Sequence, residues 1–155
     1  DYLTEVTEDA DYGWPYVYFK DHADPTHLKL NPKKVQEAME NSLMPDLPLD
    51  AHSVPLGLLF HSGKNINTEY KNGAFVVRRG GVSTSKLTGY DVLFIPFKDG
   101  KPTGAIESFL SGFIASEERG EIYGRPVGIA EALNGEIIIT DDVGGRLLLI
   151  SPLSD

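Results

Sequence analysis

One arginine stands at the start of an apolar stretch near the end of the sequence. The stretch is GRPVGIAEALNGEIIITDDVGGRLLLIS, residues 124–151, and the arginine is Arg125. A planar guanidinium can bind a carboxylate through two parallel hydrogen bonds. Two interpretations stay open for Arg125: it binds a ligand, or it is the charged, solvent-facing end of a buried strand.

Two adjacent acids in the same stretch offer a different chemistry. Asp141 and Asp142 precede a Val-Gly-Gly turn, and carboxylates are the hard oxygen ligands that calcium prefers. Acids before a glycine turn also form the turn itself by bonding to nearby backbone groups. Asp141 and Asp142 are therefore candidate metal ligands, with turn formation as the alternative.

An aromatic cluster lies near the start of the sequence, in DYGWPYVYF. Tyr12, Trp14 and Tyr16 present rings that can stack on the faces of sugars. The Gly-Trp-Pro sequence is equally typical of a packed turn. Trp14 is the candidate that we assign to a substrate or channel contact.

The remaining chemistry-bearing residues do not form a recognisable site. His22, His27 and His61 show no metal-ligand spacing, and we expect them at the surface. The sequence has no GxGxxG, Walker, HExxH or GxSxG motif. GVSTSK contains Ser83 and Lys86 but none of the companion motifs of an SxxK serine hydrolase.

Composition narrows the class of protein. The chain has 155 residues, 41% of them hydrophobic, which is enough for a packed core. A net charge of −9 argues against nucleic acid and anionic membranes as partners. No apolar run approaches the roughly 20 residues of a membrane span. The absence of cysteine excludes disulfides and thiolate metal sites.

The apolar segments predict short strands joined by tight turns. One helix is expected in NPKKVQEAMEN, with Asn31 as its cap and Pro32 at its first position. A strand is expected over residues 3–6. Seven further strands are expected in HSVPLGLLF, GAFVV, GYDVLFIPF, AIESFL, RPVGIAEA, GEIIIT and RLLLIS, with turns such as Asn134-Gly135 and Asp99-Gly100.

Four strands, a connector and three more strands favour repeated antiparallel sheets, as in a β-propeller. We expect an all-β fold in which residues 1–20 end one blade, 21–50 form a loop and helix insertion, 51–114 form a full blade and 121–153 form a three-stranded last blade. A sandwich typically shows alternating faces. Here AFVV, VLFI, EIII and LLLI are continuously apolar, which favours strands buried on both faces. We expect the chain to be part of a ring.

These same segments, with DYGWPYVYF and FLSGF, resemble the C-terminal part of the glucose/sorbosone dehydrogenase family. The resemblance covers nearly the whole chain except the helical insertion, and its motifs occur in the family's order. It implies a six-bladed propeller that is periplasmic or secreted. It also implies oxidation of an aldose or related sugar by hydride transfer to pyrroloquinoline quinone (PQQ), with calcium holding the quinone and basic residues binding its carboxylates. A cytochrome or another acceptor then takes the electrons.

The resemblance assigns roles to several residues. Arg125 matches an arginine that contacts the cofactor, and Arg78 and Arg79 fall near a second cofactor-binding position. Relatives have a histidine followed by Gly-Ser-Trp-Asn-Arg there, whereas this chain has Arg79 in place of the histidine, Val82 in place of the tryptophan and Thr84 in place of the arginine.

His52 matches a family histidine near the channel mouth, and the resemblance favours a packing or substrate-contact role for it over a catalytic one. The family's histidine base and calcium loop match positions ahead of Asp1, so no catalytic residue is assigned within this chain.

Two alternatives to a dehydrogenase stay open. The chain can belong to a propeller that binds a ligand or partner without turnover, or it can be an inactive fragment. In either case we expect its open sheets to be completed by the remaining blades or by self-association.

Overall fold

Apolar strands separated by glycine turns form two antiparallel sheets in the second part of the chain. The computed structural model describes residues 1–81 and 86–152. The chain divides into two compact units, a smaller one of Tyr2–Leu49 and a larger one of Asp1 and Asp50–Asp155, and each is described by itself. None of the helices in the described part of the chain has the length and hydrophobicity that crossing a lipid bilayer requires.

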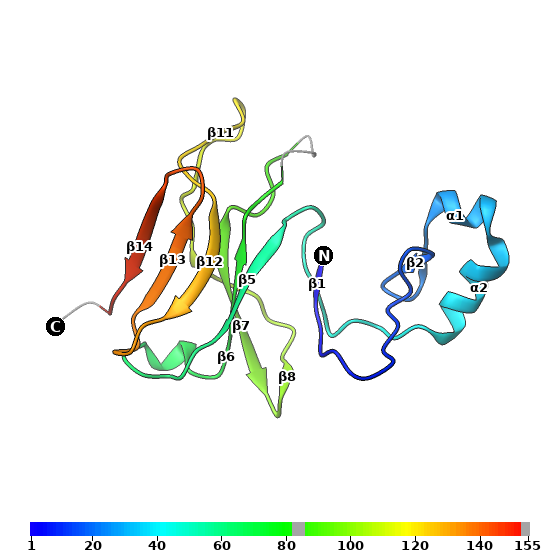
Figure 1. Cartoon of the computed structure of the whole chain (residues 1–155), viewed down its shortest axis with the longest axis horizontal. Helices are drawn as coiled ribbons and strands as arrows, with labels where there is room; N and C mark the ends of the chain where they lie inside the picture. Colours follow the sequence, from blue (N-terminus) through cyan, green and yellow to red (C-terminus); the bar gives the residue numbers. More distant parts are fainter. Residues whose placement is uncertain (82–85, 153–155) are drawn as a thin grey trace. The chain divides into compact units, whose positions relative to one another are not determined.

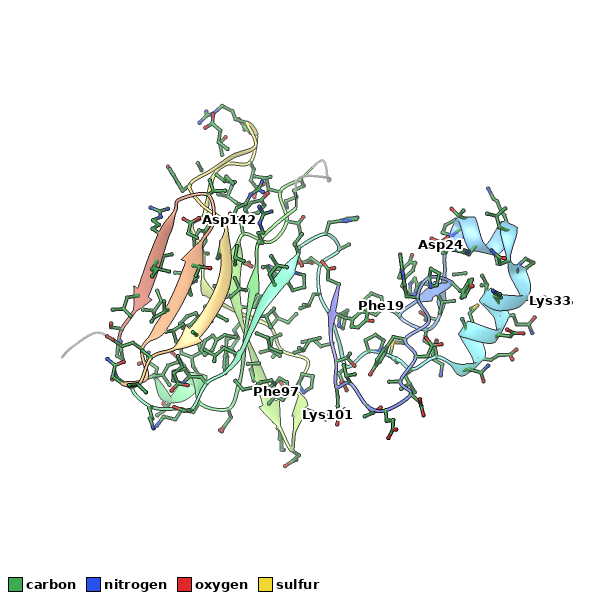
Figure 2. The ribbon with its side chains drawn as sticks, in the orientation of Figure 1. Phe19, Asp24, Lys33, Phe97, Lys101 and Asp142 are labelled. Atoms are coloured by element: carbon green, nitrogen blue, oxygen red, sulfur yellow. The ribbon has the colours of Figure 1, made fainter. Side chains whose placement is uncertain are left out.

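The first sheet is a meander of four strands, as the sequence predicts. Its order is β5-β6-β7 with β9 on the far side of β7, and β8 extends one end of β7 as a short hairpin (Figure 1). The bounds are β5 Pro55–Phe60, β6 Gly73–Arg78, β7 Asp91–Lys98, β8 Lys101–Pro102 and β9 Glu107–Leu110. The β7–β8 hairpin places Phe97 and Lys101 at one end of this sheet (Figure 2).

The second sheet has three strands, again as predicted. It consists of β12 Pro126–Glu131, β13 Ile137–Asp141 and β14 Arg146–Ile150 in that order (Figure 1). The first turn contains Asn134-Gly135, with Gly135 at φ +90, where glycine is favoured because it lacks a Cβ. Between the two sheets the chain forms the small β10–β11 hairpin, Ile114–Ser116 with Glu121–Ile122. A 3₁₀ turn, Thr68–Tyr70, lies between β5 and β6.

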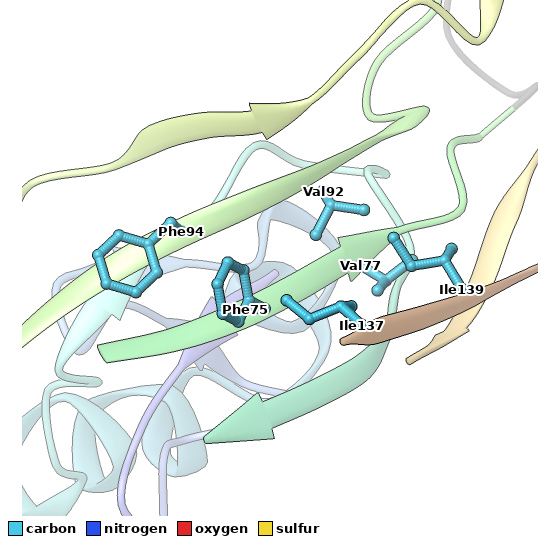
Figure 3. Packing of buried hydrophobic residues seen from close by; sticks show 6 residues of the cluster. All are labelled: Phe75, Val77, Val92, Phe94, Ile137 and Ile139. Atoms are coloured by element: carbon cyan, nitrogen blue, oxygen red, sulfur yellow. The ribbon is translucent and has the colours of Figure 1, made fainter. Parts of the chain in front are cut away.

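The core lies between the two sheets. Phe75, Val77, Val92 and Phe94 of the first sheet form one buried cluster with two isoleucines of β13, Ile137 and Ile139 (Figure 3). The continuously apolar central strands β6 and β7 are buried along most of their length, as predicted.

The last strand does not follow that prediction. Leu147 is 70% exposed and Leu149 is 58% exposed, so LLLI is buried on one face only. The reason is that alternate side chains of this edge strand point to opposite faces: Leu148 and Ile150 pack against the core, whereas Leu147 and Leu149 are exposed.

The smaller unit contains the helical insertion. It has short strand pairs, β1 Tyr2–Leu3 with β4 Leu47–Pro48 and β2 Val17–Tyr18 with β3 His22–Ala23, and helices α1 Pro25–Leu30 and α2 Pro32–Asn41. Helix α2 begins as predicted, with Asn31 at the N-cap and Pro32 at the first position, although the Asn31 side chain makes no capping bond.

Two features of the smaller unit differ from the prediction. Helix α1 was not expected. Asp24 caps it by accepting hydrogen bonds from the backbone N–H groups of Thr26 and His27 (Figure 2). The predicted strand over residues 3–6 stops at Leu3, because the backbone N–H of Glu5 donates to the Asp46 carboxylate, at 2.8 Å, instead of to a strand.

Phe75 is the residue through which the core is best tested. Its ring is fully buried and contacts the rings of Phe94 and Phe109. Phe75→Ala leaves a cavity and should lower the free energy of unfolding by about 3–5 kcal/mol in urea titrations. Leu133→Ala is the control, because Leu133 is fully exposed and its loss should change stability by less than about 0.5 kcal/mol. Equal effects of the two substitutions would contradict this core.

Candidate functional site

Loops at one end of the two sheets bring together several arginines and aspartates of the larger unit. The strand register places Arg78 beside Asp91 and Asp141 beside both Pro126 and Arg146. Because neighbouring strands run antiparallel, the end of β6 and the start of β7 lie at this end, as do the end of β13 and the start of β14. This is the end toward which β13 points (Figure 1). We call it the arginine end.

Arg125 lies at the arginine end and is half buried. Its backbone N–H donates to Oδ1 of Asp141 at 2.8 Å, and its carbonyl accepts from the N–H of Asp142 at 3.1 Å. Its guanidinium lies 5.7 Å from the centre of the Tyr90 ring. Its Nε is buried and has no hydrogen-bond partner among the described residues. Arg125 is therefore a positioned side chain with an unsatisfied donor.

Asp141 organises the loop that carries Arg125. The residue is 3% exposed and accepts from the N–H groups of Arg125 and Gly144 and from Nε of Arg146, at 2.8, 2.9 and 3.0 Å. A Cβ on Gly124 or Gly144 would lie 2.3 Å from its carboxylate, so glycine is required for this approach. Burial alone would raise the pKa of Asp141. Its hydrogen bonds and the charge of Arg146 outweigh burial and lower the pKa.

Arg78 is held by two carboxylates. Its side chain donates to both oxygens of Asp91, at 2.7 Å each, and to Asp50 at 2.6 Å. Burial alone would lower the pKa of Arg78, but these hydrogen bonds raise it. The residue is 8% exposed. All three contacts are structural, so a cofactor carboxylate would have to displace an aspartate to reach Arg78.

Arg79 bridges the two sheets. Its Nε and Nη2 each lie 2.7 Å from Oδ2 of Asp142, in the loop after β13 (Figure 2). Its backbone N–H donates to the carbonyl of Val54, just before β5. Both side chains of the Arg79–Asp142 pair are about one-third exposed, so Arg79 remains accessible.

Tyr90 was not identified from the sequence. It is 2% exposed, has φ +65, and donates its hydroxyl to the carbonyl of Gly81 at 3.1 Å. Val54 and His52 also have positive φ at this end of the unit. Positive φ is a genuine outlier for a bulky or β-branched residue, and such outliers gather at functional sites. The nearby sequence signal was Gly89-Tyr90 directly before a buried strand.

The other predicted site residues fall into different places. His52 is exposed in the loop before β5, and its carbonyl lies against Gly81. Trp14 is 81% exposed and belongs to the smaller unit. The aromatic cluster is not formed as a single group, since Tyr16 instead contacts the His27 ring. Val82 and Thr84 lie outside the described residues.

His61 corrects the expectation that it lies at the surface. It is buried, its Nε2 lies 2.8 Å from the carbonyl of Gly135, and its Nδ1 accepts from the N–H of Gly63 at 3.0 Å. Because β5 leads into His61 and Gly135 is in the β12–β13 turn, this bond joins the two sheets. His22 is exposed and His27 half buried.

The described residues do not fit a calcium site. Both oxygens of Asp141 accept hydrogen bonds, and Asp142 is paired with Arg79. No group of three or more His, Cys, Asp or Glu side chains with suitable geometry occurs in residues 1–81 and 86–152. The turn-forming interpretation therefore fits the observed contacts of Asp141.

A cavity of about 330 Å³ lies at the other end of the second sheet. Ile137 at the start of β13 and Ile150 at the end of β14 line it, with Tyr70 and Phe109 from the first sheet's side. Burial, then the charges of Glu69 and Glu107, raises the pKa of Tyr70. The cavity is thus separate from the arginine end.

Comparison with known proteins gives consistent matches. A family model described as TrAA12-like matches residues 10–152. An uncharacterized protein of Borreliella burgdorferi is 30% identical over 147 residues, which are 94% of this chain and 36% of that protein. The chain therefore spans about a third of the length of this curated relative.

Two solved structures share the fold. The holo form of the pyranose dehydrogenase PQQ domain from Coprinopsis cinerea has a TM-score of 0.59 and 21% identity, over 73% of this chain and 30% of that one. A calcium structure of a Trichoderma reesei protein of Carbohydrate-Active Enzymes Family AA12 has a TM-score of 0.69 and 19% identity, over 90% of this chain and 38% of that one. The fold of this chain is accordingly mostly β, with curled sheets that are consistent with a propeller-like architecture.

The lowered pKa of Asp141 gives a pH test of the loop. A carboxyl group whose pKa is lowered on folding stabilises the protein above its unfolded pKa, and this stabilisation is lost as the pH falls through the folded pKa. Asp141→Asn should therefore lower the free energy of unfolding by about 1–3 kcal/mol at pH 7. The difference from the unsubstituted protein should shrink progressively below the ordinary value of 3.8.

Urea titrations at several pH values measure both effects. Asp99→Asn is the matched control, because Asp99 is exposed in the β7–β8 turn and asparagine tolerates its positive φ. A difference for Asp141→Asn that is independent of pH would contradict the assigned role of the carboxylate.

Proposed function

The chain belongs to the TrAA12-like family, and from this premise we propose that it forms part of a quinoprotein sugar oxidoreductase in which Arg125 binds a carboxylate of PQQ. The family match and the likeness to a PQQ domain support this class of protein. The glucose/sorbosone type expected from the sequence is the finer prediction within it. We likewise propose an aldose or related sugar as the substrate, and a cytochrome or another acceptor for the electrons.

The buried Nε of Arg125 is the observation that carries the proposal. A buried donor of a charged group without a partner is costly, and in a protein it is normally bonded. A carboxylate of a bound quinone at the exposed part of the half-buried Arg125 would supply a charge of opposite sign and offset the cost of the unpaired Nε–H. Arg125 fits such a group because its backbone is fixed by Asp141 and Asp142 while its side chain keeps its donors.

Arg79 is the second candidate for binding a quinone carboxylate, but, unlike Arg125 in the described part of the chain, it is already paired with an aspartate. Its guanidinium already has a partner, but the pair with Asp142 is partly exposed, and exposed pairs contribute little to stability. A quinone carboxylate can compete with Asp142 for it. Arg78 is less suited to direct binding, because Asp91 and Asp50 take up its donors. We therefore propose Arg125 and Arg79 as ligand-binding residues and Arg78 as their structural neighbour.

The chemistry of the reaction is divided between cofactor and protein. When bound, PQQ supplies the acceptor for hydride from the sugar. The residues of this chain bind and orient: Arg125 and Arg79 hold carboxylates, and His52 is placed on an exposed loop where it can meet substrate. We assign no proton-transfer step to this chain. Calcium is proposed for the whole protein only, since Asp141 and Asp142, the two candidate ligands in this chain, already contact other residues.

We also propose that the two sheets are neighbouring blades of a propeller. The outer face of β14 exposes Leu147 and Leu149, and exposed apolar edges of this kind are commonly covered by another sheet or chain. The remaining blades, or a second copy of the chain, would cover them. The six-blade count and the boundaries 51–114 and 121–153 are part of this proposal, as is a periplasmic or secreted location.

Ligand binding without turnover is the second candidate function. The pairing of Arg78 and Arg79 with aspartates favours it, because among the candidate arginines in the described part of the chain only Arg125 has no aspartate partner. Dye reduction across a panel of aldoses, after addition of PQQ and calcium, separates the two functions. Quinone binding without dye reduction would support the binding function.

Arg125→Ala tests the assigned contact directly. Loss of a hydrogen bond between charged groups should weaken binding by about 1.5–3 kcal/mol, which is roughly a ten- to hundredfold rise in the dissociation constant of PQQ. Calorimetric or fluorescence titration of the cofactor-free protein measures it. Arg119→Ala is the control, since Arg119 is an exposed arginine paired with Glu121. Unchanged affinity in Arg125→Ala would reject the role of Arg125.

A further inference from the structure

We propose that Tyr90 is a positioning residue that holds the Arg125 guanidinium in place while leaving its N–H donors free for an anionic ligand. The identity of that ligand rests on the function proposed above. The position of the guanidinium does not, and it can be tested without any ligand.

Tyr90 is locked by its surroundings. A Cβ added to Gly80 would lie 2.3 Å from the Tyr90 ring, so the Gly80 backbone packs directly against it. The hydroxyl donates to the carbonyl of Gly81 at 3.1 Å, and this bond fixes the far edge of the ring. The backbone N–H of Tyr90 donates to the carbonyl of Arg78 at 3.0 Å.

The backbone of Tyr90 adopts a conformation that its residue type disfavours. At φ +65, a large aromatic residue is uncommon and persists only where the surrounding contacts require it. Its ring is 2% exposed, so these contacts are extensive. The strained residue thus presents a rigid aromatic surface to one partner, Arg125, whose guanidinium lies 5.7 Å from the ring centre.

An aromatic partner leaves the N–H donors of an arginine free for a ligand, whereas an acidic partner uses them. Arg78, Arg79 and Arg146 are each paired with aspartate, and those contacts use part of their N–H donors and offset their charge. A ring face attracts a guanidinium through its π electrons and uses none of the in-plane N–H groups. The contact with Tyr90 therefore fixes Arg125 in advance of ligand binding, which lowers the entropy lost when a ligand binds.

Substitution at Tyr90 separates the ring from the hydroxyl. Tyr90→Leu removes the ring face and should raise the dissociation constant of PQQ about three- to tenfold, as expected for loss of a partly buried cation–π contact. Tyr90→Phe keeps the ring face, so its affinity should stay within about twofold of the unsubstituted protein, although loss of the bond to Gly81 lowers its Tm. In the Arg125→Ala background, Tyr90→Leu should cause no further loss of affinity.

A measurement on the cofactor-free protein tests positioning independently. The Nε–H of Arg125 is buried, so its NMR signal should exchange slowly with water. Tyr90→Leu should make this exchange at least tenfold faster, while Tyr90→Phe should leave it slow. If the unsubstituted protein binds no PQQ, the proposed function fails, and this exchange measurement still decides the role of Tyr90.

A second substitution tests the proposal if the Tyr90→Leu protein does not fold, because it displaces the Tyr90 ring without removing it. Gly80→Ala should push the ring aside and accelerate exchange of the Arg125 Nε–H. Gly112→Ala is its matched control, because Gly112 has a similar φ of +93 against +84 but nothing within 4 Å of an added Cβ. Slow exchange in both Tyr90→Leu and Gly80→Ala would overturn the proposal. So would an equal loss of PQQ affinity from Tyr90→Leu with and without Arg125.

Discussion

The buried carboxylate of Asp141 is the interaction on which the arginine end depends. It closes the β13–β14 turn through Gly144, anchors the backbone that leads into β12 through Arg125, and binds the Arg146 side chain. The glycines on either side of it leave no room for a Cβ. One side chain thereby fixes the β13–β14 turn and the segment that leads into β12, and so determines where the Arg125 side chain begins.

The arginines at this end differ in the partners that hold them. Three arginines at this end are paired with aspartates, and one lies on an aromatic ring with a free buried donor. In a chain of net charge −9, a guanidinium without an acidic partner stands out as a local site for an anion. This difference in partners explains why the three arginines predicted from the sequence to bind the cofactor are not equally suited to it, although all of them lie at strand ends.

Local patterns predicted most of the fold, and long-range contacts account for what they missed. The apolar runs and glycine turns predicted the strands of both sheets, and Asn31-Pro32 predicted the start of α2. Helix α1 is only six residues long, so its sequence is too short to show a helical repeat of apolar residues, and the cap residue Asp24 alone did not predict it. The burial of His61 depends on Gly135 in a distant turn, and that contact leaves no local trace in the sequence. Tyr90 and Arg125 are likewise far apart along the chain, so only the assembled sheets bring them together.

The two sheets are joined differently at their two ends, and this difference has a consequence for solution conditions. At the cavity end the His61–Gly135 hydrogen bond is buried, whereas at the arginine end the Arg79–Asp142 ion pair is partly exposed. Dissolved ions weaken exposed ion pairs as the salt concentration rises, and they hardly affect buried hydrogen bonds. Rising salt should therefore weaken the Arg79–Asp142 contact at the arginine end, while the buried core and the His61–Gly135 hydrogen bond keep the two sheets packed together.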